Sequence, residues 1–103
     1  DVGPMEATRL VNQQDAVLVD TREEGEFRQG HIINAIHIPL SDFGRRSAEL
    51  DRYKDRPVIA YCRSGSRSNG AGSILKKHGF ENVYNLSGGI AAWQKASLPV
   101  STK

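Results

Sequence analysis

Four short apolar runs, separated by stretches with helical periodicity, constrain most strongly what this chain can fold into. The runs are AVLVD (16–20), AIHIP (35–39), PVIAY (57–61) and NVYNL (82–86). Short, nearly continuous apolar runs suit strands that are buried on both faces, as in parallel sheets. Because helical stretches connect them, we predict an α/β fold in which a parallel sheet carries helices on both faces.

The segments around these runs predict short helices. PMEATRLVNQ (4–13) places Met5, Leu10 and Val11 on one side of a helix, and EEGEFRQ (23–29) is a helix that Gly30 would cap. The segment LPV (98–100) is expected to be a tail. The remaining predicted helices are FGRRSAELDRY (43–53), which would be a charged surface helix, a segment from about Ser66 to Gly79, and GGIAAWQKA (88–96).

Length and charge exclude several classes of protein. A chain of 103 residues has the size of one ordinary domain, so we expect residues 1–103 to form a single domain. Its 14 basic and 12 acidic residues are interspersed, which argues against nucleic acid as a partner. We expect a cytoplasmic protein, because no apolar stretch approaches the ~20 residues that span a bilayer and no apolar core of a signal peptide appears in the sequence. The chain begins at Asp1 without Met, so a membrane anchor upstream of Asp1 stays an open alternative.

The content of cysteine and histidine bears on metal and disulfide chemistry. A single cysteine excludes an intramolecular disulfide and a cysteine-based zinc site. The three histidines and the carboxylates lack the spacing of metal ligands. We therefore expect neither a metal nor a cofactor, and the sequence leaves the oligomeric state open.

The one cysteine, Cys62, lies where the run PVIAY gives way to the loop of YCRSGSRSNGAG (61–72). In an open parallel sheet this edge, beyond the carboxyl ends of the strands, is where ligands bind. Successive backbone N–H groups and the start of the next helix would cradle an anion there, and Gly65 supplies the freedom that a tight ring needs. With Arg63 and Arg67 nearby, the thiol of Cys62 should have a lowered pKa. The predicted substrate-binding and persulfide cradle comprises Arg63, Ser64, Gly65, Ser66, Arg67 and Ser68.

Most free cysteines are inert buried thiols, and this is the alternative for Cys62. Such cysteines usually have apolar neighbours, whereas Cys62 is flanked by arginine, serine and glycine. We therefore predict that Cys62 is a catalytic nucleophile. The serines of the loop could instead only fill a tight turn or cap the helix.

The motif CRSGSR (62–67) resembles the active-site loop of the rhodanese family, the single-domain thiosulfate sulfurtransferases. The segments 17–39 and 79–100 are similar to the amino-terminal and carboxy-terminal signatures of that family. The residues that carry these two likenesses are Asp20, Arg22, Glu26, Phe27, Gly30, His31, Ala35, Ile38 and Pro39, and then Gly88, Gly89, Trp93 and Pro99. The chain departs from the family pattern at Asn34, where many relatives have Gly, and at His37, where many have Asn.

The resemblance implies a parallel sheet of five strands and a two-step transfer of sulfur. Cys62 would take the outer sulfur of thiosulfate, or of a persulfide donor, and pass it from its own persulfide to cyanide or a thiol. Arg63 and Arg67 would hold the oxyanion end of the donor. A protein that supplies or receives the persulfide is an alternative partner.

Other residues of the two signatures have predicted roles of their own. Asp20 ends its strand at the same edge as Cys62, and it would either support the active loop or only cap a turn. Arg22 and Glu26 are expected to form an ion pair. His31 is expected to be structural, and Trp93 to belong to the core.

The sequence leaves two rival functions open. Cysteine phosphatases and arsenate reductases share a cysteine–loop–arginine cradle, but the phosphatase pattern puts the arginine six residues after the cysteine. That position is Ser68 here, and Arg67 comes one residue earlier. The second rival is a docking module or persulfide relay, in which a partner protein replaces the small substrate.

Overall fold

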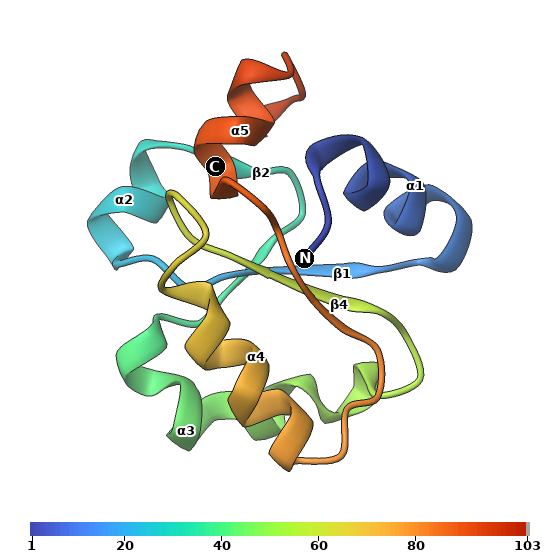
Figure 1. Cartoon of the computed structure of the whole chain (residues 1–103). Coiled ribbons are helices and arrows are strands. Elements are labelled where there is room, and N and C mark those ends of the chain that lie inside the picture. Colours follow the sequence, from blue (N-terminus) through green and yellow to red (C-terminus); the bar gives the residue numbers. More distant parts are fainter. Residues whose placement is uncertain (103) are drawn as a thin grey trace.

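A parallel sheet of four strands forms the centre of the computed structural model, which describes residues 1–102 (Figure 1). The strands are β1 (Val17–Asp20), β3 (Ile36–His37), β4 (Val58–Tyr61) and β5 (Val83–Asn85), in the order β3-β1-β4-β5. Each of them falls within one of the four apolar runs. The α/β fold with a parallel sheet is therefore confirmed.

Two short pairings extend the sheet region. Val2 forms an isolated parallel bridge with Leu86, so the fifth strand implied by the resemblance is reduced to one bridge beside β5. Strand β2 (His31–Ile32) pairs in the antiparallel sense with β6 (Val100–Ser101). The segment LPV, predicted as a tail, is thus partly a strand.

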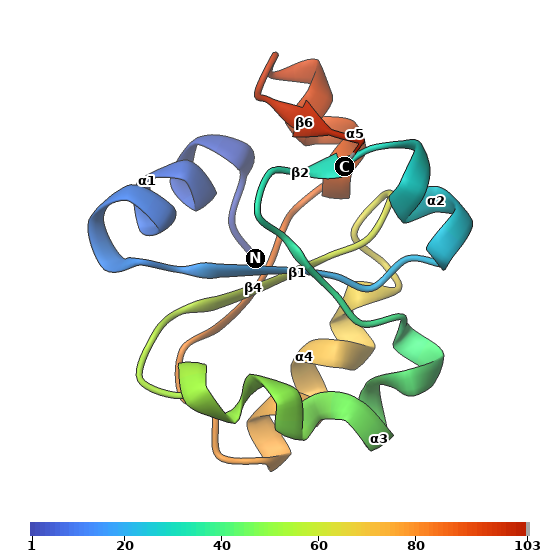
Figure 2. The same ribbon diagram turned by 180° about the vertical axis from the view of Figure 1, so that it is seen from behind.

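Helices cover both faces of the sheet, as the two opposite views show (Figure 1, Figure 2). Helices α1 (Pro4–Gln14) and α5 (Gly89–Lys95) lie on one face, and α3 (Phe43–Arg46) and α4 (Ser68–Lys77) lie on the other. The short α2 (Glu24–Gln29) follows β1 and ends at Gly30, as predicted. Within residues 1–102, no helix combines the length and the apolar character needed to cross a membrane.

The side chains of the strands alternate between two apolar clusters. Val19 and Ala60 contribute to the cluster under α3 and α4, whereas Leu18, Ile59 and Tyr61 contribute to the cluster under α1 and α5. This alternation is what the pleat of a strand buried on both faces produces. The two layers hold the carboxyl ends of β1 and β4 at one edge.

Two predictions for the helices need correction. Met5 is 67% exposed, and Ala7 and Leu10 form the buried side of α1 instead. Residues 43–53 do not form one surface helix: α3 passes into a 3-10 helix (Ser47–Tyr53). Phe43 and Leu50 in this segment are fully buried, because the segment packs on the same face of the sheet as α4.

Asn34, at a position where many rhodanese relatives have glycine, adopts a left-handed backbone conformation with φ of 67°. Glycine reaches this region without steric cost, and asparagine is among the few other residues that tolerate it. The departure from the family pattern is therefore compatible with the same backbone turn.

Candidate active site

Cys62 lies directly after β4, at the edge of the sheet where β1 also ends. Asp20 and Tyr61 are paired in register at that edge, so Asp20 and Cys62 are neighbours there, as predicted. The loop between β4 and α4 runs from residue 62 to residue 67, and α4 begins at Ser68. The described structure therefore places the cysteine and its loop where an open α/β sheet binds ligands.

The sulfur of Cys62 is enclosed by its own loop. Cys62 is 0% exposed, the backbone N–H of Gly65 donates to Sγ at 3.1 Å, and the hydroxyl of Ser68 lies 3.6 Å from Sγ. Burial opposes ionisation, but the Ser68 hydroxyl and the N–H groups of Ser68, Gly65 and Ser64 together lower the pKa of the Cys62 thiol. The sulfur is thus buried among hydrogen-bond donors rather than among apolar groups.

The two loop arginines differ from each other in their contacts. Arg67 donates two hydrogen bonds of 3.1 Å to the carboxylate of Glu26 on α2, and this contact holds the pKa of Glu26 below its usual range. Arg63 is exposed and has no ion-pair partner within residues 1–102. Arg63 is therefore the loop cation that stays free to attract an anion, and Arg67 ties the loop to α2.

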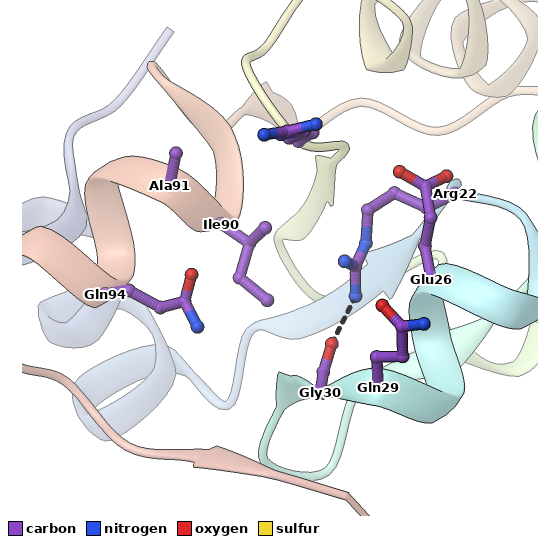
Figure 3. Close-up of a pocket in the computed structure, with 8 residues that line it drawn as sticks. Arg22, Glu26, Gln29, Gly30, Ile90, Ala91 and Gln94 are labelled. Carbon is purple, nitrogen blue, oxygen red and sulfur yellow. Dashed lines mark hydrogen bonds between the residues drawn. The ribbon is translucent and has the colours of Figure 1, made fainter.

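Asp20 and Arg22 form a buried ion pair, so the predicted pair of Arg22 with Glu26 is wrong. The Asp20 carboxylate accepts from the Arg22 backbone N–H at 2.8 Å and from Nη2 at 2.7 Å. Nη2 also donates to the carbonyl oxygen of Gly30 at 2.6 Å (Figure 3). Asp20 thus caps the turn after β1 and also orients Arg22, and it makes no hydrogen bond to the cysteine loop among those that the structure describes.

Asn85, at the end of β5, is a part of the site that our sequence analysis missed. Its side-chain N–H donates to the Gly65 carbonyl at 3.1 Å, and its oxygen is the second acceptor, beside Sγ of Cys62, for the one proton of the Ser68 hydroxyl. The signal was available, because the run NVYNL carries a polar residue, Asn85, next to its carboxyl end, at the same sheet edge as Cys62. Asn85 thereby holds in place both the cysteine loop, at Gly65, and the Ser68 hydroxyl that faces the sulfur.

Helix α5 supports the loop from the other side. The N–H groups of Ile90 and Ala91 donate to the carbonyl oxygens of Cys62 and Arg63, at 2.9 and 3.2 Å. Gly89, with φ of 59°, sits so close to this peptide that a β-carbon there would lie 2.5 Å from the Arg63 carbonyl carbon. Gly89, one of the predicted signature residues, thus serves the close packing of α5 against the active loop, whereas a β-carbon at Gly88 would meet Ala92 within α5.

His31 packs as a structural residue, as predicted. Its ring stacks on Phe27 with centroids 3.8 Å apart, and its Nδ1 lies 2.9 Å from the Phe27 carbonyl oxygen. His37 stacks on the same phenyl ring, and its Nε2 lies 2.7 Å from the Arg22 carbonyl oxygen. The two histidines therefore brace the segment that carries Arg22.

A polar pocket of about 410 Å³ opens beside the loop. Arg22, Glu26 and Gln29 come from the segment after β1, and Ile90 and Gln94 come from α5 (Figure 3). Gly30, Arg63 and Ala91 complete its lining. No group of three histidine, cysteine or carboxylate side chains that could hold a metal occurs within residues 1–102.

The comparison with protein families is decisive at this point: residues 4–96 match the family described as Rhodanese-like domain. The chain belongs to the rhodanese-like family. It is 42% identical to a protein of Allochromatium vinosum named sulfurtransferase, over 89% of this chain and 84% of the relative. It is 35% identical to a Coxiella burnetii protein named thiosulfate sulfurtransferase GlpE, over 97% of this chain and 91% of the relative.

Solved structures agree on the fold of this rhodanese-like chain. A rhodanese-related protein from Thermoplasma volcanium superposes with a TM-score of 0.89 at 26% identity. The likeness covers 100% of this chain and 98% of that protein. The family identified from the three sequence signatures is thus confirmed by sequence and by structure.

A first prediction follows from the surroundings of the sulfur. Only the thiolate is alkylated, so alkylation of Cys62 should set in at a lower pH than for an ordinary thiol, since the pKa of Cys62 is lowered. Ser68→Ala removes the nearest hydroxyl and should raise the midpoint of the pH–rate profile by about one pH unit. The measurement is the rate of iodoacetamide alkylation against pH.

Ser66→Ala is the matched control for Ser68→Ala. Ser66 is exposed, whereas Ser68 is fully buried beside the sulfur, so only the second substitution should move the midpoint. Equal midpoints for the parent and Ser68→Ala would contradict the role that we give to the hydroxyl.

Proposed function

We propose that this chain is a sulfurtransferase that moves sulfur from thiosulfate or a persulfide donor to a thiol or cyanide through a persulfide on Cys62. The observation that carries the proposal is the enclosed sulfur of Cys62, which faces hydrogen-bond donors at the ligand-binding edge of the sheet. Membership of the rhodanese-like family, and relatives named sulfurtransferase, support the same reaction. Thiosulfate as the donor is supported by the name of the Coxiella relative.

The first half-reaction loads the enzyme. The Cys62 thiolate attacks the outer sulfur of thiosulfate, a bond forms between the two sulfurs, and the bond from the outer sulfur to the sulfonate breaks. Sulfite leaves with the electron pair of that bond, and Cys62 carries a persulfide. Because negative charge moves onto the outer sulfur, N–H donors of the loop stabilise both the thiolate and the product.

The second half-reaction returns the cysteine. A thiolate or cyanide forms a bond to the outer sulfur, and the bond between the two sulfurs breaks with its electron pair left on Sγ. The chain has one cysteine, so the acceptor comes from outside the chain. We assign Arg63 to attraction of the anionic substrates, and Ser64, Gly65, Ser66 and Ser68 to the loop that surrounds the sulfur.

We also propose that residues 1–103 form one rhodanese domain and that the protein is cytoplasmic.

The phosphatase alternative lacks support in the site, because Arg67 is engaged by Glu26 and Ser68 occupies the position of the phosphatase arginine. A persulfide relay uses the same chemistry with a protein as donor or acceptor. It shares the first test with the small-molecule enzyme.

Intact-mass spectrometry after incubation with thiosulfate tests the loading step. We expect the parent protein to gain the mass of one sulfur atom, and dithiothreitol to remove it. Cys62→Ser is the control and should gain nothing. A parent protein that stays unmodified while both thiosulfate and a low-molecular-weight persulfide are offered would contradict the proposed function.

A further inference from the structure

The pocket beside the loop has no part in holding the sulfur itself, yet it borders the peptide that carries the sulfur. Arg63, which lines it, follows Cys62 directly, and the backbone N–H of Ile90, which also lines it, donates to the Cys62 carbonyl oxygen. A molecule in this pocket would therefore lie next to the peptide that joins Cys62 to Arg63.

The charges around the pocket do not cancel. Arg22 is neutralised by Asp20, and Glu26 is neutralised by Arg67. Arg63 is the one charged lining residue whose charge no partner within residues 1–102 balances. Arg22, Glu26 and Arg63 are all the charged residues of the lining. The pocket as a whole therefore presents one uncompensated positive charge.

The uncharged polar groups of the pocket are two glutamines. Gln29 from α2 and Gln94 from α5 stand on opposite sides of it (Figure 3). Neither side chain makes a hydrogen bond to another residue among the contacts described for residues 1–102, so both amides are free to bind a ligand. Two free amides and one free guanidinium suit a small molecule with a carboxylate.

We propose that this pocket is the binding site of the sulfur acceptor and that it selects a small thiol bearing a negative charge, such as a mercaptocarboxylic acid. The volume of about 410 Å³ lies at the lower end of the range of about 300–1,000 Å³ for small-ligand sites. The inference rests on the proposed function, because it assumes that a persulfide forms on Cys62.

The transfer step fixes the orientation of the acceptor. Its thiolate forms a bond to the outer sulfur of the persulfide, and the bond between that sulfur and Sγ breaks. The electron pair remains on Sγ, which restores the Cys62 thiolate, and the acceptor leaves as a persulfide. The carboxylate of the acceptor stays behind in the pocket, near Arg63 and the two amides.

Three thiols of similar size test the selectivity: 3-mercaptopropionate, 2-mercaptoethanol and cysteamine, which carry a negative charge, no charge and a positive charge. The protein is first loaded with sulfur, and the loading is verified by mass. The loss of the sulfur is then followed in single turnovers with each thiol. The readout is the rate with the anionic thiol divided by the rate with the cationic thiol, and the neutral thiol is the reference for both.

The variants change the charge of the pocket without altering its shape. Gln94→Glu and Gln29→Glu each add one negative charge, and Gln13→Glu is the matched control, because Gln13 is exposed on α1 and does not line the pocket. Intrinsic thiol reactivity cancels when the same ratio is compared between variants. We expect the ratio to fall roughly threefold in each pocket variant and roughly tenfold in the double variant, and to stay unchanged in Gln13→Glu.

Two outcomes of the selectivity experiment would contradict the proposal. A ratio that is the same in the parent and in the double variant, or that falls as much in Gln13→Glu, would overturn the pocket assignment. A second readout does not depend on loading: 3-(methylthio)propionate, which has no thiol, should shift the NMR signals of the Gln29 and Gln94 side-chain amides at lower concentration than 3-(methylthio)propylamine does. Equal binding of these two probes overturns the inference, whereas failure of sulfur loading overturns the proposed function alone.

Discussion

Cys62→Ser is expected to reduce thiosulfate:cyanide sulfur transfer to less than about one thousandth of the parent rate. The hydroxyl of serine does not ionise near neutral pH, so the attack on the outer sulfur of thiosulfate is lost. Folding should be retained, because serine has nearly the size of cysteine and its oxygen can accept the hydrogen bond from the Gly65 N–H. The measurement is the steady-state rate of thiocyanate formation.

Thermal unfolding separates chemistry from folding in this experiment. The thermal unfolding midpoint of Cys62→Ser should lie close to that of the parent, since the enclosed site keeps its donors and its volume. A sulfur-transfer rate within tenfold of the parent rate in a correctly folded Cys62→Ser protein would contradict the assignment of Cys62 as the nucleophile.

Much of the fold could be predicted from the sequence, because the strands have one simple signature. Runs such as AVLVD and PVIAY have apolar residues on both faces of the strand, and only a sheet covered on both sides gives such runs a place. Segments without a strong period were less predictable. Residues 43–53 carry many charges, yet Phe43 and Leu50 are fully buried, and periodicity could not show that the helix changes type at Ser47.

The position of the site could be predicted, but the partners of its charged residues could not. The rule that ligands bind beyond the carboxyl ends of parallel strands placed Cys62 and Asp20 at one edge. Sequence spacing favoured an ion pair between Arg22 and Glu26, because the two residues are four positions apart in the sequence. In the fold, residue 22 precedes α2, so Arg22 turns to Asp20 and leaves Glu26 to reach Arg67, 41 residues away.

These ion pairs give the three arginines of the site different roles. Arg22 and Arg67 each have a carboxylate partner, so they position the turn after β1 and the cysteine loop. Arg63 keeps its charge uncompensated at the pocket, which is where an anionic donor or acceptor would arrive. A substitution of Glu26 would therefore change the loop by releasing Arg67, although Glu26 makes no contact with the sulfur itself among those that the structure describes.

The loop also depends on α5, and Gly89→Ala should show this with a large effect. A β-carbon at position 89 would lie 2.5 Å from the Arg63 carbonyl carbon and oxygen and closer still to the Cys62 carbonyl oxygen. The atoms in the way belong to the backbone, so the loop or α5 must move, and φ of 59° disfavours alanine in addition. We expect the free energy of unfolding to fall by about 2–4 kcal/mol and sulfur transfer to be lost.

Gly72→Ala is the matched control, because it is the same change in α4, the helix that follows the cysteine loop. A β-carbon at position 72 would meet only the Val83 side chain, at an ordinary 3.5 Å, and alanine favours a helix over glycine by about 1 kcal/mol. Gly72→Ala should therefore unfold at a slightly higher denaturant concentration than the parent and keep full activity, while Gly89→Ala loses both stability and activity. If Gly89→Ala kept the parent's stability and rate, the contact of α5 with the Cys62–Arg63 peptide would not be what holds the active loop in place.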